Sequence, residues 1–140
     1  MTLSIKEKAV LITGECFCGS VKYQVDGKLR DGISCHCSRC RKAFNAQSSA
    51  AAVVEPGKFT WLEGEVLLAS YVNKQGYGLQ FCKTCGSTLC TIYNDQVIQV
   101  SLGCVNGDPE IEIEKHIYVG SKANWEVMPD GVVQFEEGPV

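Results

Sequence analysis

The chain has 140 residues, of which 45% are hydrophobic and 21% are charged, and its formal net charge is −3. This acidic balance argues against a nucleic-acid partner, because such proteins present a basic face or stripe. No apolar run approaches the ~20 residues that a membrane span needs. Residues 1–8 are charged and lack the apolar stretch of a secretory signal. We therefore expect a cytoplasmic protein that forms one domain over residues 1–140.

Short segments rich in Val, Ile, Thr, Tyr and Phe recur along the chain, separated by Gly, Asn and Asp. Many short strands at such spacing are typical of an all-β sandwich, barrel or folded sheet. The predicted strands are 21–25, 50–54, 59–62, 67–72, 88–93, 97–102 and 117–119. Helical signal is scant: we expect one turn over 39–44 and another over 121–125, with Ser121 as its N-cap. The chain is predicted to be mostly β.

The nine cysteines are the unusual feature of the composition. In a reducing compartment, cysteines at close spacing are more often metal-binding or catalytic than disulfide-bonded, and their odd number favours the same interpretation. Seven of them fall in three clusters beside turn signals, where a glycine lets the backbone fold back and point amides at the sulfurs. The clusters are Cys16-x-Cys18-Gly19, Cys35-His36-Cys37-x-x-Cys40 and Cys82-x-x-Cys85-Gly86. This pattern predicts zinc held by thiolates.

Seven thiolates divide naturally into four and three, and so predict two zinc ions per chain. A closed four-cysteine site is structural, whereas three protein ligands with an open position are typical of a catalytic site. The middle cluster supplies three thiolates alone, so the flanking pairs would form the four-cysteine site. Spacing does not exclude other divisions, such as Cys16 and Cys18 with two cysteines of the middle cluster. The predicted structural ligands are Cys16, Cys18, Cys82 and Cys85, and the predicted catalytic ligands are Cys35, Cys37 and Cys40.

A zinc ion held by three thiolates carries a formal charge of −1 before its fourth ligand arrives. It is a poorer Lewis acid than a zinc held by three neutral histidines, and its soft ligands favour a thiol as the fourth ligand. Thiol transfer or addition is therefore favoured over hydrolysis. Arg39, Arg41 and Lys42 lie beside the cluster and would either offset its charge or hold a substrate carboxylate. The alternative for these cations is an ordinary solvated surface.

Four ordered motifs resemble one known family of zinc proteins. They are Gly14-Glu15-Cys16-Phe17-Cys18-Gly19, Cys35-His36-Cys37-Ser38-Arg39-Cys40-Arg41-Lys42, Phe81-Cys82-Lys83-Thr84-Cys85-Gly86, and the tail from His116-Ile117-Tyr118-Val119 through Trp125. Together they make the chain similar, from about Gly14 to Glu137, to the glutathione-dependent formaldehyde-activating (GFA) and centromere-protein-V-like family. The sequence departs from the family around Cys90, where an aromatic or larger apolar residue is common.

The resemblance implies a β-tent fold of antiparallel sheets with two zinc ions, one held by the outer cysteine pairs and one by Cys35, Cys37 and Cys40. It implies a carbon–sulfur lyase-type activity, the formation of S-(hydroxymethyl)glutathione from glutathione and formaldehyde. The thiol partner would be glutathione or a similar small molecule. The alternative is a non-catalytic module, held together by zinc, that binds another protein. A closed four-thiolate centre at the middle cluster would favour this alternative, and an open position within a pocket would favour the enzyme.

The remaining candidates have less specific interpretations. His36 lies between two predicted ligands, but neighbouring side chains point apart, so a position behind the ligands or on the surface is favoured. His116 is predicted to be a hydrogen-bonded core histidine. Cys104 either approaches the three-thiolate zinc or is a small buried residue, the second being favoured. Cys90 is predicted to belong to the core. Four aromatic residues could line a pocket but are more often packing residues, namely Trp61, Tyr71, Phe81 and Trp125.

Overall fold

The structure is a computed structural model that describes residues 10–138. Residues 1–8, where the sequence predicts no secretory signal, lie outside the described residues. The strands are β1 (Leu11–Glu15), β2 (Lys22–Asp26), β3 (Arg30–Cys35), β4 (Ser49–Val53), β5 (Phe59–Glu63), β6 (Leu68–Val72), β7 (Tyr77–Cys82), β8 (Thr88–Tyr93), β9 (Gln96–Ser101) and β10 (Lys115–Ile117). The helical elements are α2 (Ser38–Phe44), η1 (Glu65–Leu67), η2 (Leu102–Cys104) and η3 (Val119–Ser121). No helix in the described range has the length and apolar character to cross a membrane.

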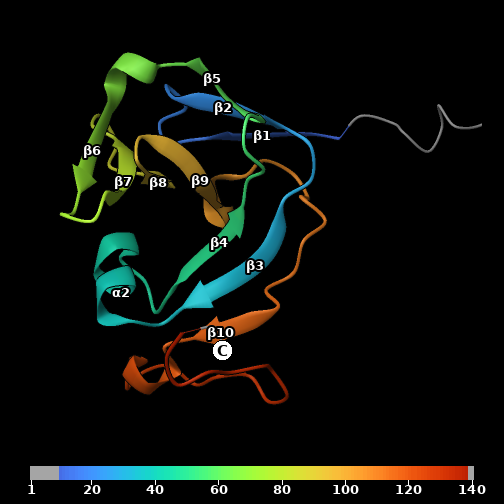
Figure 1. The fold of residues 1–140 in the computed structure, drawn as a ribbon, viewed down its shortest axis with the longest axis vertical. Coiled ribbons are helices and arrows are strands. Elements are labelled where there is room, and N and C mark those ends of the chain that lie inside the picture. The colour runs from blue at the N-terminus through green and yellow to red at the C-terminus, as the bar shows by residue number, and fades with distance from the viewer. Residues whose placement is uncertain (1–9, 139–140) are drawn as a thin grey trace, which may run out of the picture.

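The ten strands of the described range form two sheets. A three-stranded antiparallel sheet has the order β1-β2-β5, and a seven-stranded sheet has the order β10-β3-β4-β9-β8-β7-β6. In Figure 1 the three-stranded sheet lies at the top, and the long sheet curves from β10 at the bottom to β6 at the left. All pairs are antiparallel except β10 with β3, which is parallel. The prediction of a mostly β chain with antiparallel sheets and short helical turns is confirmed.

The core is filled by side chains from both sheets. Tyr23 and Val25 of β2 join Leu89 of β8 and Val100 of β9 in one buried cluster. The Tyr23 ring stacks on Phe59 with centroids 5.0 Å apart. Apolar contact between the two sheets therefore closes the fold around a single core.

Glycine shapes this core at one point. Gly14 of β1 lies opposite Tyr23 in the register, and a Cβ atom added to Gly14 would overlap the Tyr23 ring. A side chain at this position is therefore excluded by the large aromatic residue on the neighbouring strand.

The predicted helical turn after the middle cluster is confirmed as α2. Its N-cap is Cys37, whose thiol accepts a hydrogen bond from the Cys40 amide, and its C-cap Asn45 adopts a left-handed conformation. The second predicted helix, over 121–125, is wrong. Ser121 ends a 3₁₀ turn instead of beginning a helix, because the left-handed Tyr118 starts the turn earlier and Lys122 returns to extended backbone.

Three strands lie where the sequence predicted none. β3 contains Asp31-Gly32, which resembles a turn, yet Asp31 has a φ of 55° within an irregular register against β4. β1 and β7 contain glycines that also resemble turn signals, although their backbones pair with neighbouring strands. The predicted strand at 117–119 lies two residues earlier, as β10, because Tyr118 leaves the extended region.

The buried Tyr23 hydroxyl generates a stability prediction. It has no hydrogen-bond partner among the described residues, and burial raises the pKa of Tyr23. Removing an unpaired buried hydroxyl removes a desolvation penalty of about 1–3 kcal/mol. We expect Tyr23→Phe to leave the free energy of unfolding unchanged or to raise it, and Tyr23→Ala to lower it by about 3–5 kcal/mol. Denaturant unfolding of both variants measures this, and a loss in Tyr23→Phe as large as in Tyr23→Ala would contradict it.

Candidate metal centres

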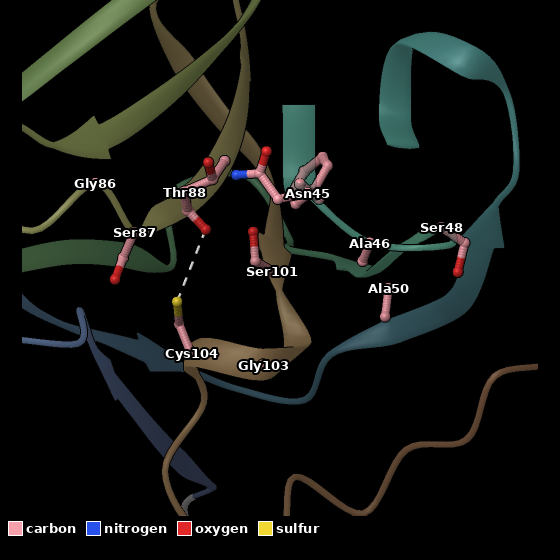
Figure 2. Close-up of a pocket in the computed structure, with 11 residues that line it drawn as sticks. Asn45, Ala46, Ser48, Ala50, Gly86, Ser87, Thr88, Ser101, Gly103 and Cys104 are labelled. Carbon is pink, nitrogen blue, oxygen red and sulfur yellow. Dashed lines mark hydrogen bonds between the residues drawn. The ribbon is translucent and has the colours of Figure 1, made fainter. Parts of the chain in front are cut away.

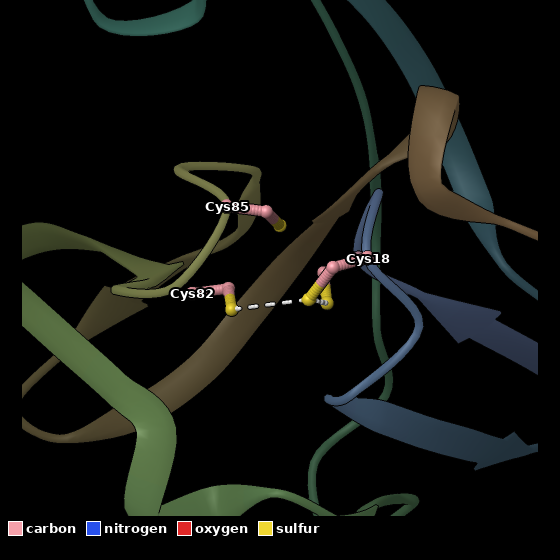
Figure 3. A group of neighbouring side chains, drawn as sticks. Cys18, Cys82 and Cys85 are labelled. Carbon is pink, nitrogen blue, oxygen red and sulfur yellow. Dashed lines mark hydrogen bonds between the residues drawn. The ribbon is translucent and has the colours of Figure 1, made fainter.

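Four thiols from two distant turns meet beside the core. Cys16 and Cys18 follow β1, Cys82 ends β7, and Cys85 lies in the turn before β8. Their sulfur atoms all lie within 4.8 Å of one another. The Cys18 sulfur is 3.6 Å from that of Cys16 and 3.9 Å from that of Cys82. Figure 3 shows Cys18 on one turn facing Cys82 and Cys85 on the other.

This cluster passes a geometric test for zinc. A tetrahedral zinc with bonds of about 2.3 Å holds its sulfurs about 3.8 Å apart, which is the spacing that the two shorter sulfur pairs already have. The four-sulfur donor set is also that of a structural zinc. The other division of the cysteines, in which the first pair joins the middle cluster, is not the one that the structure adopts.

Each pair is held by a turn with a left-handed glycine. Gly19 has a φ of 80° and Gly86 a φ of 82°. Their amides donate to the backbone carbonyls of Cys16 and Cys82 at 3.0 and 2.7 Å. The amide that reaches a sulfur is instead that of Val21, which donates to the Cys16 sulfur at 3.3 Å. The glycines thus close the turns, and a later amide supports the thiolate.

A serine follows each of these glycines, and sequence reasoning missed both. Hydrogen bonding with Ser20 lowers the pKa of Cys18. Burial alone would raise the pKa of Cys85, but hydrogen bonding with Ser87 helps to bring it to about 6. The Ser87 hydroxyl also accepts a hydrogen bond from the Phe17 amide at 2.7 Å, which joins the two turns. The repeated Cys-Gly-Ser in the sequence was the available signal.

The middle cluster forms a second, three-thiol group at the junction of β3 and α2. Cys35 ends β3, Cys37 caps α2, and Cys40 lies in the first turn of the helix. Their sulfurs lie within 4.8 Å of one another, and no other His, Cys, Asp or Glu between residues 10 and 138 joins the group. Three soft donors at this spacing suit zinc with one further ligand position.

Hydrogen bonding within this group favours a thiolate. A hydrogen bond from Cys35 is the main reason why the pKa of Cys40 falls to about 6, with further help from Cys37, Ser49 and the charge of Arg39. The same bond raises the pKa of Cys35. Mutual hydrogen bonding thus favours one anionic sulfur in the pair, which suits the binding of a cation.

A groove of about 630 Å³ opens at this cluster, between α2 and the β6–β7 hairpin. Figure 1 shows α2 below β6 and β7, the elements that carry much of the lining. Arg41 does not line the groove. The predicted basic side chains are thus divided, two facing the groove and one outside it. We call this cavity the thiol groove and define it by Cys35, Arg39, Cys40, Lys42, Tyr71 and Tyr77.

The two histidines and an acidic residue form a chain behind the middle cluster. His36 is 0% exposed, so it lies behind the ligands and the surface position is wrong. Its Nε2 atom is 2.9 Å from Nδ1 of His116, and its Nδ1 atom is 3.1 Å from Oε1 of Glu126, at an angle too poor for a hydrogen bond. Burial lowers the pKa of His116. The predicted hydrogen bond of His116 is confirmed, although this residue is only partly buried.

Glu126 was missed because it lies in an irregular segment with no sequence motif. Lys122 turns this segment back by donating to the carbonyls of Ala123 and Glu126 at 3.2 and 2.8 Å. The later tail is fixed to β10, where the Phe135 amide donates to His116 at 2.9 Å. These bonds bring Glu126 to the rear of the middle cluster.

Cys104 lies apart from the three-thiol group. It lines a separate cavity of about 320 Å³, where its sulfur is 3.7 Å from the carbonyl oxygen of Thr88, as Figure 2 shows. The interpretation in which Cys104 approaches the second zinc is therefore wrong. Cys90 is fully buried as predicted, and burial raises its pKa to about 12.

The predicted aromatic candidates divide between core and groove. Trp61 packs on Phe59 and Tyr23, and Phe81 is partly buried on β7. Tyr71 is the only one of the four that lines the thiol groove. Trp125 is 70% exposed.

Comparison with known proteins now decides the family. The sequence model of the family described as glutathione-dependent formaldehyde-activating enzyme (GFA) matches residues 11–121. The chain belongs to the GFA family. Comparison with curated proteins gives no match. Among solved structures, a protein from Rhodobacter sphaeroides, determined as a structural genomics target, has a similar fold. The TM-score is 0.58 at 22% identity, over 88% of this chain and 98% of that one.

The first cluster generates a metal-removal prediction. A structural zinc contributes about 10–16 kcal/mol, which exceeds the total stability of most domains of this size. We therefore expect Cys82→Ser to lose one zinc and to unfold at room temperature, whereas Cys104→Ser, a half-buried cysteine outside both clusters, retains both. Elemental analysis with circular dichroism measures this. A folded Cys82→Ser protein with its full zinc content would contradict it.

The buried histidine chain generates a second prediction. Because Oε1 of Glu126 lies 3.1 Å from Nδ1 of the fully buried His36, we expect Glu126→Gln to lower the free energy of unfolding by about 1 kcal/mol. His36 lies between Cys35 and Cys37, so any zinc bound at the middle cluster should also leave it more readily. The control is Glu137→Gln, whose side chain is exposed. Equal stability and equal rates of zinc release to a chelator in both variants would contradict the assignment.

Proposed function

We propose that this protein is a zinc-dependent enzyme that joins a small thiol to a carbonyl compound, with glutathione and formaldehyde as the reference pair. The observation that carries the proposal is the thiol groove, where Cys35 and Cys40 of a three-thiol group line a cavity beside two cations. Membership of the GFA family supports the same substrate pair.

The two clusters would each hold one zinc ion, with Cys16, Cys18, Cys82 and Cys85 binding a structural ion and Cys35, Cys37 and Cys40 a functional one. When bound at the three thiolates, zinc supplies a soft, open position that favours a thiolate as fourth ligand. The rest of the site is built from the chain itself. His36 fixes the backbone between two of the ligands from behind, through its contacts with His116 and Glu126.

The cations of α2 orient the thiol substrate. Arg39 and Lys42 lie on one wall of the groove, and glutathione carries two carboxylates that a guanidinium or an ammonium group can hold. A substrate carboxylate bound there leaves its thiol free to reach the cysteine end. Orienting the two reactants costs translational and rotational entropy. The favourable free energy of substrate binding offsets this cost and brings the sulfur close to the carbonyl carbon.

The chemical step is an addition that needs no oxidant. The thiol sulfur forms a bond to the carbonyl carbon, the π electron pair of the carbonyl moves to its oxygen, and that oxygen takes the proton that the thiol gives up. The product is a hemithioacetal, S-(hydroxymethyl)glutathione for the reference pair. The cation of Arg39 or Lys42 offsets the negative charge that develops on oxygen.

The second candidate is a non-catalytic module held together by zinc. It would require a closed four-thiolate centre at the middle cluster. The absence of Cys104 from that cluster and the groove beside it both favour the enzyme.

The test compares wild-type protein with Cys37→Ser, in which one of three ligands is removed. We expect the variant to retain the zinc of the first cluster, to stay folded, and to consume formaldehyde no faster than free glutathione does. Elemental analysis gives the zinc content, and loss of formaldehyde gives the rate. Cys104→Ser is the control and should keep both zincs and full activity.

Two outcomes would contradict different parts of the proposal. Full activity in a Cys37→Ser protein that has lost one zinc would exclude the middle cluster as the catalytic site. A wild-type protein with both zincs that gives no acceleration over free glutathione would exclude this substrate pair.

A further inference from the structure

The thiol groove has two walls of different chemistry. On the α2 side, Arg39 and Lys42 supply the charged side chains, and none of the described residues that line the groove is acidic. On the opposite side, Tyr71 of β6 and Tyr77 and Leu79 of β7 present aromatic and apolar surface. A molecule that filled the groove would therefore meet positive charge on one side and apolar rings on the other.

Strand register explains how this apolar wall arises. Tyr71 pairs with Leu79, Leu79 with Thr91, and Thr91 with Gln99. Paired residues point to the same face of a sheet, so these side chains form one row across four strands. The row runs from aromatic at the edge strand β6 to polar at β9 and forms the floor of the groove.

The two tyrosines of this wall, Tyr71 in the row and Tyr77 beside it on β7, are exposed enough to contact a ligand. The Tyr77 ring packs on Tyr93 with centroids 4.4 Å apart, while Tyr71 is 67% and Tyr77 48% exposed. A Cβ atom on Gly78 would overlap the carbonyl oxygen of Tyr71. The glycine therefore permits β6 to approach β7 closely, which positions the Tyr71 ring at the groove. Exposed apolar surface within a cavity is typical of a ligand contact.

The adduct of formaldehyde and glutathione has no large apolar group that would contact the tyrosine wall of the groove. Formaldehyde contributes one carbon to the adduct, and glutathione is a charged tripeptide whose carboxylates suit the α2 wall. We propose that the thiol groove accepts an amphipathic adduct, in which a carboxylate-bearing thiol carries an extended apolar or aromatic group from a carbonyl compound larger than formaldehyde. This inference rests on the proposed function, since it assigns the substrate class of the same site.

The added group changes nothing in the chemical balance of the step. The thiol sulfur bonds to the aldehyde carbon, the π pair moves to oxygen, and oxygen takes the thiol proton. The aldehyde substituent then lies along the row from the cysteine end toward Tyr71 and Tyr77, while the thiol carboxylates stay at Arg39 and Lys42.

The test measures binding of two stable thioethers to the zinc-loaded protein by calorimetry. S-hexylglutathione and S-methylglutathione carry identical charges and differ only in apolar length. We expect the hexyl compound to bind at least about tenfold more tightly, because part of each added methylene is buried.

Tyr71→Ala and Tyr77→Ala should each remove most of this preference and leave the affinity for the methyl compound within about twofold. Leu62→Ala, which removes an exposed apolar side chain from β5 of the other sheet, should keep the preference.

Each other outcome overturns the inference. Equal affinity for the two thioethers in wild-type protein means that the tyrosine wall does not select apolar groups. A change from dimer to monomer in Tyr71→Ala, measured by light scattering, with the hexyl preference unchanged, means that a second copy of the chain covers the wall. The proposed function fails separately. Suppose that S-(hydroxymethyl)glutathione formation is not accelerated but the tyrosine variants lose the preference for the hexyl compound. The inference about the ligand class then stands, and the proposed reaction is excluded.

Discussion

The meeting of four thiols across two sheets is the constraint on which the rest of the structure depends. Cys18 and Cys82 are 64 positions apart in the sequence, yet their sulfurs lie 3.9 Å from each other. The first belongs to the β1–β2 turn of the small sheet and the second to the β7–β8 turn of the long sheet. Ordering so distant a pair has a large entropic cost in a chain of this length. A bound metal offsets that cost directly, because the unfolded chain has no preformed site.

This constraint reaches the thiol groove through β7. The strand ends at Cys82 in the first cluster and begins at Tyr77 in the groove wall. One strand of six residues, with a register shift between Gln80 and Phe81, therefore carries a thiol of the first cluster and part of the groove lining. On the other side of the groove, α2 is fixed by the middle cluster and by the buried contacts of His36. The groove therefore depends on both cysteine clusters, although only the middle cluster lines it.

Most of the site was predictable from the sequence and much of the fold around it was not. Cysteines at short spacing, such as Cys37 and Cys40, lie on one turn whatever the tertiary structure, so the sequence predicts that they cluster. Glu126 reaches His36 only because the tail folds back along β10, a long-range contact that leaves no local pattern. Strands such as β3 were missed because Asp31 and Gly32 form a bulge rather than the turn that they resemble. Tertiary pairing overrode local propensity there.

The difference between the two clusters follows from the elements that carry them. Two turns facing each other supply two thiols each, the number that a closed structural zinc site requires. A single β–α junction supplies three thiols within six residues, and a fourth ligand must come from another element. Here the element across from Cys35 and Cys40 is the β6–β7 hairpin, which contributes tyrosines and leaves a groove instead of a fourth thiol. Topology thus gives the first cluster four thiols and the second three, and it places the second beside a groove that Arg39 and Lys42 line.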